Sequence, residues 1–270
     1  MFVQVDPFPV HANPRLPIWR PILTFLVVSA AMSPLLALVQ DRCGLDPETL
    51  RLTQFSTLVG AVVVLVYWRG RLVLPPATRS GFLVPIVAGA AAACGVLIGI
   101  WALGRLTSQH WDVLDVATLP DSIAVVLVAS LLGTAAEEIG WRGVVQPLLE
   151  TRTGAIRAMI GTGLLFGVGH FYVASEGPLV YLLFVIGATA MSVIFGTLSA
   201  GRTIFGRTVA ASIAHWFVNF VLLLFFSDGD SSAVWMAQLA AASALIAGFC
   251  VYRMSAGAQR QMQSTTLIST

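Results

Sequence analysis

The sequence predicts an all-α polytopic membrane protein with about eight transmembrane helices around a polar cavity in the membrane. The 270 residues are 57% hydrophobic and only 10% charged, whereas a soluble domain carries about 25% charged residues. The mean hydropathy is +0.86. Apolar runs also recur along the whole chain, at about the 20-residue length that a helix needs to cross a bilayer. A few polar side chains interrupt three of these runs, and we expect them to share the cavity.

Turn and charge signals divide the chain into eight apolar segments, and each is expected to be a helix. We expect one membrane domain over residues 20–252, with a leader over residues 1–19 and a tail over residues 253–270. The leader is expected to be retained, because seven further candidate spans follow the first. The eight segments cover residues 20–40, 52–69, 81–104, 122–148, 156–174, 178–199, 207–226 and 232–252.

The distribution of arginine predicts the orientation. Eight spans place both termini on one side of the membrane. All fifteen basic residues are arginine, and twelve of them fall on the side of the termini, against Arg42, Arg51 and Arg105 on the other. The positive-inside rule then predicts cytoplasmic termini, in a multi-pass protein of the plasma or cytoplasmic membrane.

Composition also excludes several functions. A net charge of +2 predicts no nucleic-acid partner. The chain has no lysine, which excludes Schiff-base chemistry. Its three cysteines lie far apart without a C-x-x-C spacing, so neither a disulfide framework nor a cysteine metal site is expected. There is no G-x-S-x-G motif, and no histidine stands at helical spacing from Cys94 or Cys250, so no covalent nucleophile is expected.

Six polar groups fall inside the predicted spans. A charged side chain at the middle of a spanning helix costs about 2.5–3.5 kcal/mol on insertion scales, so such residues are functional candidates. They are Glu137, Glu138 and Arg142 on the fourth span, His170 on the fifth, and His215 and Asn219 on the seventh.

Helical spacing sorts the charges of the fourth span. Glu138 and Arg142 stand four residues apart, so they share a helix face and can pair. Glu137 is turned by about 100° from Glu138 and has no basic partner at helical spacing. This leaves Glu137 as the carboxylate that is free for chemistry.

Depth in the membrane brings these groups together. With a rise of about 1.5 Å per residue, Glu137, His170 and Asn219 lie roughly 18–22 Å from the cytoplasmic loops, and His215 roughly 12 Å. We expect these four groups to meet in one layer, in a cavity open to the cytoplasm, with Arg142 nearer its mouth.

Two chemistries fit this set. A carboxylate and a histidine can orient and deprotonate a water for attack on a carbonyl, while a second histidine and an amide donate hydrogen bonds to the oxyanion. Alternatively, Glu137, His170 and His215 could hold a zinc ion with an open position for water. Spacing leaves both open, and both lead to hydrolysis of an amide bond.

Three motifs resemble a known family. They are E-E-x-x-x-R at Glu137 to Arg142, F-x-x-x-H at Phe166 to His170, and H-x-x-x-N at His215 to Asn219. In this order, on three separate spans within residues 122–226, they resemble the CPBP family. This family comprises the type II CAAX prenyl proteases and the bacteriocin-processing enzymes, also called Abi-type membrane proteins.

The resemblance implies an intramembrane endopeptidase that acts on a membrane-associated or prenylated-type peptide or protein. It implies that Glu137 and His170 activate the water and that His215 and Asn219 form the oxyanion pocket. Glu138, Arg142 and Phe166 would then have supporting roles, the two charged residues by shaping the site.

The family has been labelled both a metalloprotease and a metal-free glutamate protease. Asn219 suits an oxyanion donor better than a zinc ligand, so we expect no required cofactor and keep zinc as the alternative.

A second hypothesis is a non-enzymatic membrane protein. The same buried carboxylates could serve an immunity or docking protein, or could carry protons in a coupled carrier. Paired repeats and interrupted helices, which are typical of carriers, are not evident in the sequence.

Overall fold

The computed structural model describes residues 17–68, 70–72, 74–79, 81, 83–108, 113–225 and 232–268, with side chains up to residue 257. Every regular element in these ranges is helical, which confirms the predicted class. The α-helices are α1 (Trp19–Cys43), α2 (Phe55–Tyr67), α3 (Leu83–Leu106), α4 (Ile123–Gly140), α5 (Gln146–Thr153), α6 (Ala155–Gly169), α7 (Pro178–Ser199), α8 (Ile204–Phe225) and α9 (Ala233–Ile268). The shorter elements are the 3₁₀ helices η1 (Leu52–Gln54), η2 (Val116–Thr118) and η4 (Phe171–Glu176), and the π-helix η3 (Trp141–Val145).

All eight predicted segments are helical, but they differ in length. Among the described residues, six helices are long and apolar enough to cross a membrane, with α4, η3 and α5 counted as one helix over Ile123–Thr153. Two further apolar helices, Leu52–Tyr67 and Ala155–Gly169, are shorter than 18 residues. The chain is therefore an integral multi-pass membrane protein, and its described part holds six candidate spans and two shorter apolar helices.

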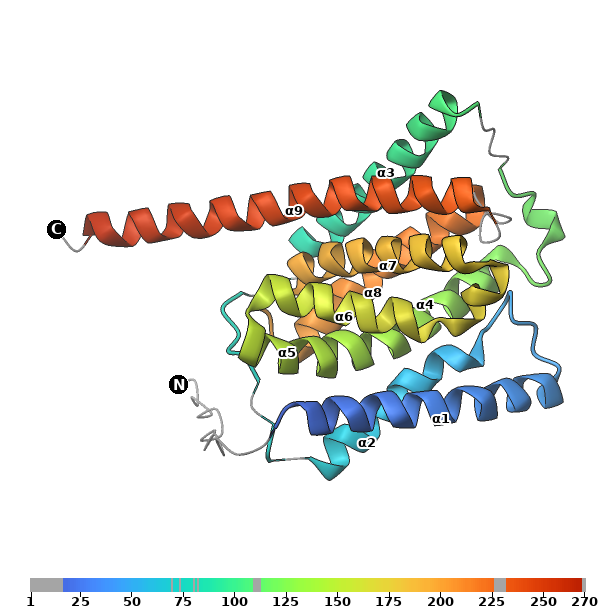
Figure 1. The fold of residues 1–270 in the computed structure, drawn as a ribbon, viewed down its shortest axis with the longest axis horizontal. Coiled ribbons are helices and arrows are strands. Elements are labelled where there is room, and N and C mark those ends of the chain that lie inside the picture. The colour runs from blue at the N-terminus through green and yellow to red at the C-terminus, as the bar shows by residue number, and fades with distance from the viewer. Residues whose placement is uncertain are drawn as a thin grey trace.

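The helices run back and forth along one direction, so the bundle has two ends (Figure 1). The terminal end carries the start of α1, the α5–α6 junction, the α7–α8 connection and the end of α9. The distal end carries the α1–α2, α3–α4 and α6–α7 connections. Hydrogen bonds join connections within each end: the Thr78 N–H donates to Gly201 O at 2.6 Å, and the Thr49 hydroxyl donates to Asp121 Oδ2 at 2.7 Å.

Two hydrophobic clusters flank the middle of the bundle. One gathers residues of α1, α2, η3 and α5, including Trp141 and Val145. The other gathers residues of α3, α7, α8 and α9, including Phe195 and Ala214. Arg142 follows Trp141 of the first cluster and His215 follows Ala214 of the second, so the first and third motifs each adjoin one cluster.

Close contact between α6 and α7 depends on glycine. A Cβ added to Gly163 would lie 2.6 Å from the Cα of Thr189, and one added to Gly167 would lie 3.0 Å from the Cα of Val185. Such distances leave no room for a side chain, so the two backbones pack directly against each other. This contact holds the end of α6, where the second motif lies, against α7.

The predicted domain boundaries stay predictions. Most of the predicted leader, residues 1–16, lies outside the described residues. At the other end of the chain, α9 continues without a break past residue 252 and ends at Ile268.

Candidate active site

The first motif and the third motif meet at Glu138. The Glu138 side chain is fully buried, and its Oε1 lies 2.9 Å from Nη1 of Arg142, which is 2% exposed. The predicted pairing along the helix is therefore present. The same oxygen lies 2.8 Å from Nδ1 of His215 on α8. Glu138 thus joins α4 to α8. The helical spacing of Glu138 and Arg142 did not predict this second contact.

This contact fixes which nitrogen of the His215 ring faces Glu138. Nδ1 lies against a carboxylate oxygen, so Nδ1–H donates to Glu138, and Nε2 is the nitrogen left to face a substrate. Phe195 stacks on the imidazole with ring centroids 5.0 Å apart, and the Arg142 guanidinium carbon lies 5.4 Å from the centre of the Phe195 ring. A stacked ring and a hydrogen bond therefore both constrain His215.

Glu137 has a different environment from its neighbour. It is 7% exposed, and no described residue donates a hydrogen bond to its carboxylate. It lies within electrostatic range of His215, Arg142 and Arg51. A buried carboxylate with cations nearby and no fixed hydrogen bond is the group of this site that can still accept a proton.

His170 lies at the end of α6 and not within a span, so the predicted span over residues 156–174 is too long. The helix ends at Gly169, since the His170 N–H bonds to Gly167 O at 3.1 Å and leaves the carbonyl of Phe166 unpaired. Nδ1 of His170 forms a hydrogen bond with that carbonyl oxygen, at 2.7 Å. A carbonyl can only accept, so Nδ1 carries the proton and Nε2 is the basic nitrogen.

Phe166 connects the second motif to the other two. Its ring centroid lies 4.3 Å from that of His170, 5.6 Å from that of Trp141 and 6.2 Å from that of His215. The predicted supporting residue therefore packs between both histidines and the helix that carries the glutamates.

Asn219 lies one turn beyond His215 on α8 and faces α4. Its Nδ2 donates to Thr134 Oγ1 at 3.4 Å, a long contact, and the Thr134 hydroxyl donates to Ser130 O at 2.7 Å. Thr134 stands one turn before Glu138. Asn219 is thus on the same side of α4 as the Glu138–His215 contact, and it is weakly held.

The helix widens directly after the two glutamates. Trp141–Val145 forms a π-helix, a feature that is frequent at functional sites. Just before it, a Cβ on Gly140 would lie 2.7 Å from the Phe25 ring and 3.0 Å from Thr57 O. The glycine lets α1 and α2 approach α4 beside Glu137. The sequence carries no signal for the π turn.

The prediction that Arg142 lies nearer a cytoplasmic mouth stays a prediction. Arg142 is 2% exposed, and Val145 and Gln146, three and four residues further toward the terminal end, are 0% exposed. Beyond them, Arg207 forms a second buried ion pair with Glu150, with Nη2 and Oε2 2.8 Å apart. Sequence reasoning placed these two residues in loops and missed the pair. Packed side chains therefore cover the terminal side of the site.

The exposed residues nearest the site lie at the distal end. Arg51 precedes η1 and is exposed, and it lies within electrostatic range of both Glu137 and His170. Its guanidinium carbon lies 5.8 Å from the centre of the Tyr172 ring, and that ring lies 5.7 Å from the His170 ring. Sequence reasoning counted Arg51 only as a loop charge.

The described residues do not fit a zinc site as they stand. No three His, Cys, Asp or Glu side chains within the described ranges gather closely enough to hold a metal ion. Nδ1 of each histidine is engaged, by Glu138 or by Phe166 O, which leaves Nε2 of each as its only nitrogen able to bind a metal. We therefore derive no step through zinc.

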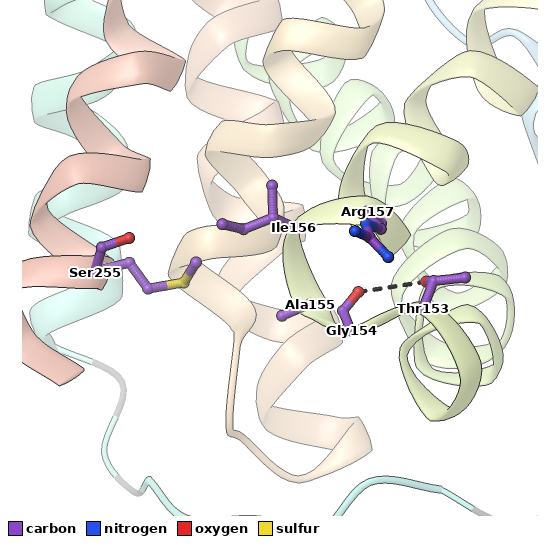
Figure 2. Close-up of a pocket in the computed structure, with 7 residues that line it drawn as sticks. Thr153, Gly154, Ala155, Ile156, Arg157 and Ser255 are labelled. Atoms are coloured by element: carbon purple, nitrogen blue, oxygen red, sulfur yellow. Dashed lines mark hydrogen bonds between the residues drawn. The ribbon is translucent and has the colours of Figure 1, made fainter. Parts of the chain in front are cut away.

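A surface groove of about 360 Å³ lies away from these residues, between the α5–α6 junction and α9 (Figure 2). None of the motif residues lines it, so it is not the predicted polar cavity, which stays a prediction. The groove is lined by Thr153, Gly154, Ala155, Ile156, Arg157, Met254 and Ser255.

Comparison with known proteins supports the reading of the motifs. Residues 119–221 match the family model described as "Type II CAAX prenyl endopeptidase Rce1-like". This range contains all seven predicted site residues, from Glu137 to Asn219. No curated protein matches the chain. By this match, residues 119–221 are similar to the type II CAAX prenyl endopeptidase Rce1-like family, which supports the resemblance that the three motifs carry.

Proposed function

We propose that the protein is an intramembrane endopeptidase that hydrolyses one peptide bond of a membrane-associated or prenylated-type substrate with a water activated by Glu137 and His170. The observation that carries this proposal is the buried arrangement in which Glu138 holds Arg142 and His215 while Glu137 keeps no hydrogen-bond donor among the described residues. The family match supports the peptidase class.

The reaction needs no group beyond the substrate, a water and these side chains. The Glu137 carboxylate takes a proton from the water, with Nε2 of His170 orienting it, and the oxygen forms a bond to the carbonyl carbon. The carbonyl oxygen becomes an oxyanion, which accepts hydrogen bonds from Nδ2 of Asn219 and from Nε2–H of doubly protonated His215. The Glu138 carboxylate stabilises that imidazolium through Nδ1.

Collapse of the tetrahedral intermediate completes hydrolysis. The C–N bond breaks, its electron pair stays on nitrogen, and the proton held by Glu137 moves to the leaving amine. The products are a carboxylic acid and an amine, and Glu137 is an ionised carboxylate again. The same residue serves as base and then as acid, as general acid–base catalysis requires.

The test is cleavage of a prenylated reporter peptide by the purified protein in detergent, with products identified by mass spectrometry. The parent is expected to cleave one bond. His170→Ala is expected to lower kcat by about 10²-fold, as for a group that assists proton transfer. His110→Ala is the matched control and should cleave like the parent. Equal rates for His170→Ala and the parent would contradict the proposal.

We further propose that the reaction is metal-free. The support is chemical: Asn219 offers an amide donor suited to an oxyanion, and an amide is a poorer zinc ligand than histidine or a carboxylate. Elemental analysis of the purified protein is expected to give substoichiometric zinc, and a strong chelator should leave the cleavage rate unchanged. Stoichiometric zinc together with chelator-sensitive cleavage would contradict this part of the proposal.

We also propose that the terminal end faces the cytoplasm. At the distal end the described arginines are Arg42, Arg51 and Arg105, and the larger share lies toward the terminal end, as the positive-inside rule requires of a cytoplasmic face.

Thiol labelling tests this orientation. Cys43 ends α1 and is exposed. With Cys94 and Cys250 replaced by serine, a membrane-impermeant maleimide should label Cys43 in intact cells. A second variant that carries Ser255→Cys and Cys43→Ser should be labelled only after permeabilisation. The reverse pattern would overturn the orientation.

A further inference from the structure

We propose that Tyr181 is a positioning residue, whose hydroxyl holds the end of α6, and with it the His170 imidazole, in the place where hydrolysis needs it. This inference rests on the proposed function, in which His170 orients the attacking water. Tyr181 lies in the first turn of α7, across the 3₁₀ helix η4 from His170. None of the three motifs includes it.

Side chains hold the end of α6. The last carbonyls of an α-helix have no partner within the helix, so helix ends fray unless other groups bind these oxygens. The Phe166 carbonyl binds the His170 ring at 2.7 Å, and the Val168 carbonyl accepts a hydrogen bond from the Tyr181 hydroxyl at 2.6 Å. One donor thus belongs to the site itself, and the other comes from the next helix.

The backbone that carries Tyr181 is itself well held. Gly177, directly before α7, has a φ of 113°, which favours glycine and allows a sharp turn between η4 and α7. The Tyr181 N–H then donates to Gly177 O at 3.0 Å. The hydroxyl therefore reaches Val168 from the fixed start of a long helix.

Other residues of α7 also contact the end of α6, but without a direction. Phe184 stands three residues after Tyr181, on the same helix face, and its ring centroid lies 5.2 Å from that of His170. Val185 is the residue against which Gly167 packs. Apolar contacts are non-directional, whereas a hydrogen bond depends on angle as well as distance. Tyr181 therefore adds a directional contact that can fix the last turn.

The placement of His170 matters because its Nε2 must orient the water. A displacement of about 1 Å at a reacting group can lower a rate by about 10²-fold. The His170 ring is bound to a carbonyl of the same last turn, so fraying of that turn displaces the ring. Loss of the Tyr181 hydroxyl should therefore reduce the fraction of molecules with His170 in place, which lowers kcat and leaves substrate binding intact.

The first test removes the hydroxyl alone. Tyr181→Phe is expected to lower kcat for the reporter peptide by about tenfold, as for the loss of one hydrogen bond, with KM within about twofold. The matched control is Tyr252→Phe, because Tyr252 lies on α9 and is 68% exposed; it should cleave like the parent. An unchanged kcat in Tyr181→Phe, with or without a higher KM, would overturn the inference.

A second background separates positioning from general stability. In His170→Ala protein, the further change Tyr181→Phe should alter the remaining rate by less than about twofold, because the hydroxyl acts through a ring that is no longer there. If Tyr181→Phe lowers the rate by about tenfold in both backgrounds, its role is structural only and the inference is wrong.

Hydrogen exchange gives a readout that does not depend on hydrolysis. The His170 N–H bonds to Gly167 O at 3.1 Å. In Tyr181→Phe protein the amides of residues 169–173 should exchange about tenfold faster, while those of α8 around His215 stay unchanged. Unchanged exchange at His170 would refute the inference. If the parent does not cleave the peptide, the proposed hydrolysis fails, and exchange alone decides whether Tyr181 holds His170.

Discussion

Replacing Glu137 with glutamine is expected to lower kcat for hydrolysis of the reporter peptide by about 10³-fold, within the range that a general base contributes. Glutamine has nearly the shape of glutamate but cannot accept the proton of the attacking water or return it to the leaving amine. KM should change by no more than about twofold, because the substrate contacts remain. Steady-state cleavage by purified protein gives both constants.

The matched control for this prediction is Glu176→Gln. Glu176 ends η4 at the distal end and is exposed, so its loss removes a carboxylate of the same type without touching the site. It should cleave at the parental rate. A Glu137→Gln protein that retains most of the parental kcat, with unchanged thermal stability, would show that Glu137 is not the base.

Replacing Arg142 with methionine is expected to lower the free energy of unfolding by about 3 kcal/mol, the lower end of the range for removal of one partner from a buried ion pair. The reason is that fully buried Glu138 would keep only His215 as a partner. Denaturant or thermal unfolding of the purified protein measures the loss. Arg42→Met, which removes an exposed arginine, should have little effect.

A double-mutant cycle separates loss of the pair from loss of packing. In Arg142→Met with Glu138→Gln, the buried negative charge is gone, so the double variant should recover most of the stability lost by Arg142→Met alone. If the double variant is no more stable than the single one, the loss comes from packing of the arginine stem, and the ion pair is not what stabilises α4.

Much of the fold follows from apolar run length. Each of the eight predicted segments is helical because no water in the bilayer can satisfy exposed backbone groups. The contact between Glu138 and Arg142 also follows from the sequence, since it depends only on helical spacing. The extent of two segments did not follow: α2 and α6 are shorter than predicted, and α6 ends where the His170 side chain takes the Phe166 carbonyl.

Contacts between distant segments could not be predicted from spacing. The bond from His215 to Glu138 spans 77 positions, and the pair between Glu150 and Arg207 spans 57. Both depend on how helices pack, which a single sequence does not specify.

The most direct test of the central claim is a comparison of membrane proteins from cells that carry the parent and cells that carry Glu137→Gln. Mass spectrometry of protein termini is expected to reveal at least one membrane-associated protein that is cleaved in the first cells and accumulates uncleaved in the second. Identical sets of termini, with both forms of the chain present at equal levels, would contradict the claim that Glu137 hydrolyses a peptide bond in the membrane.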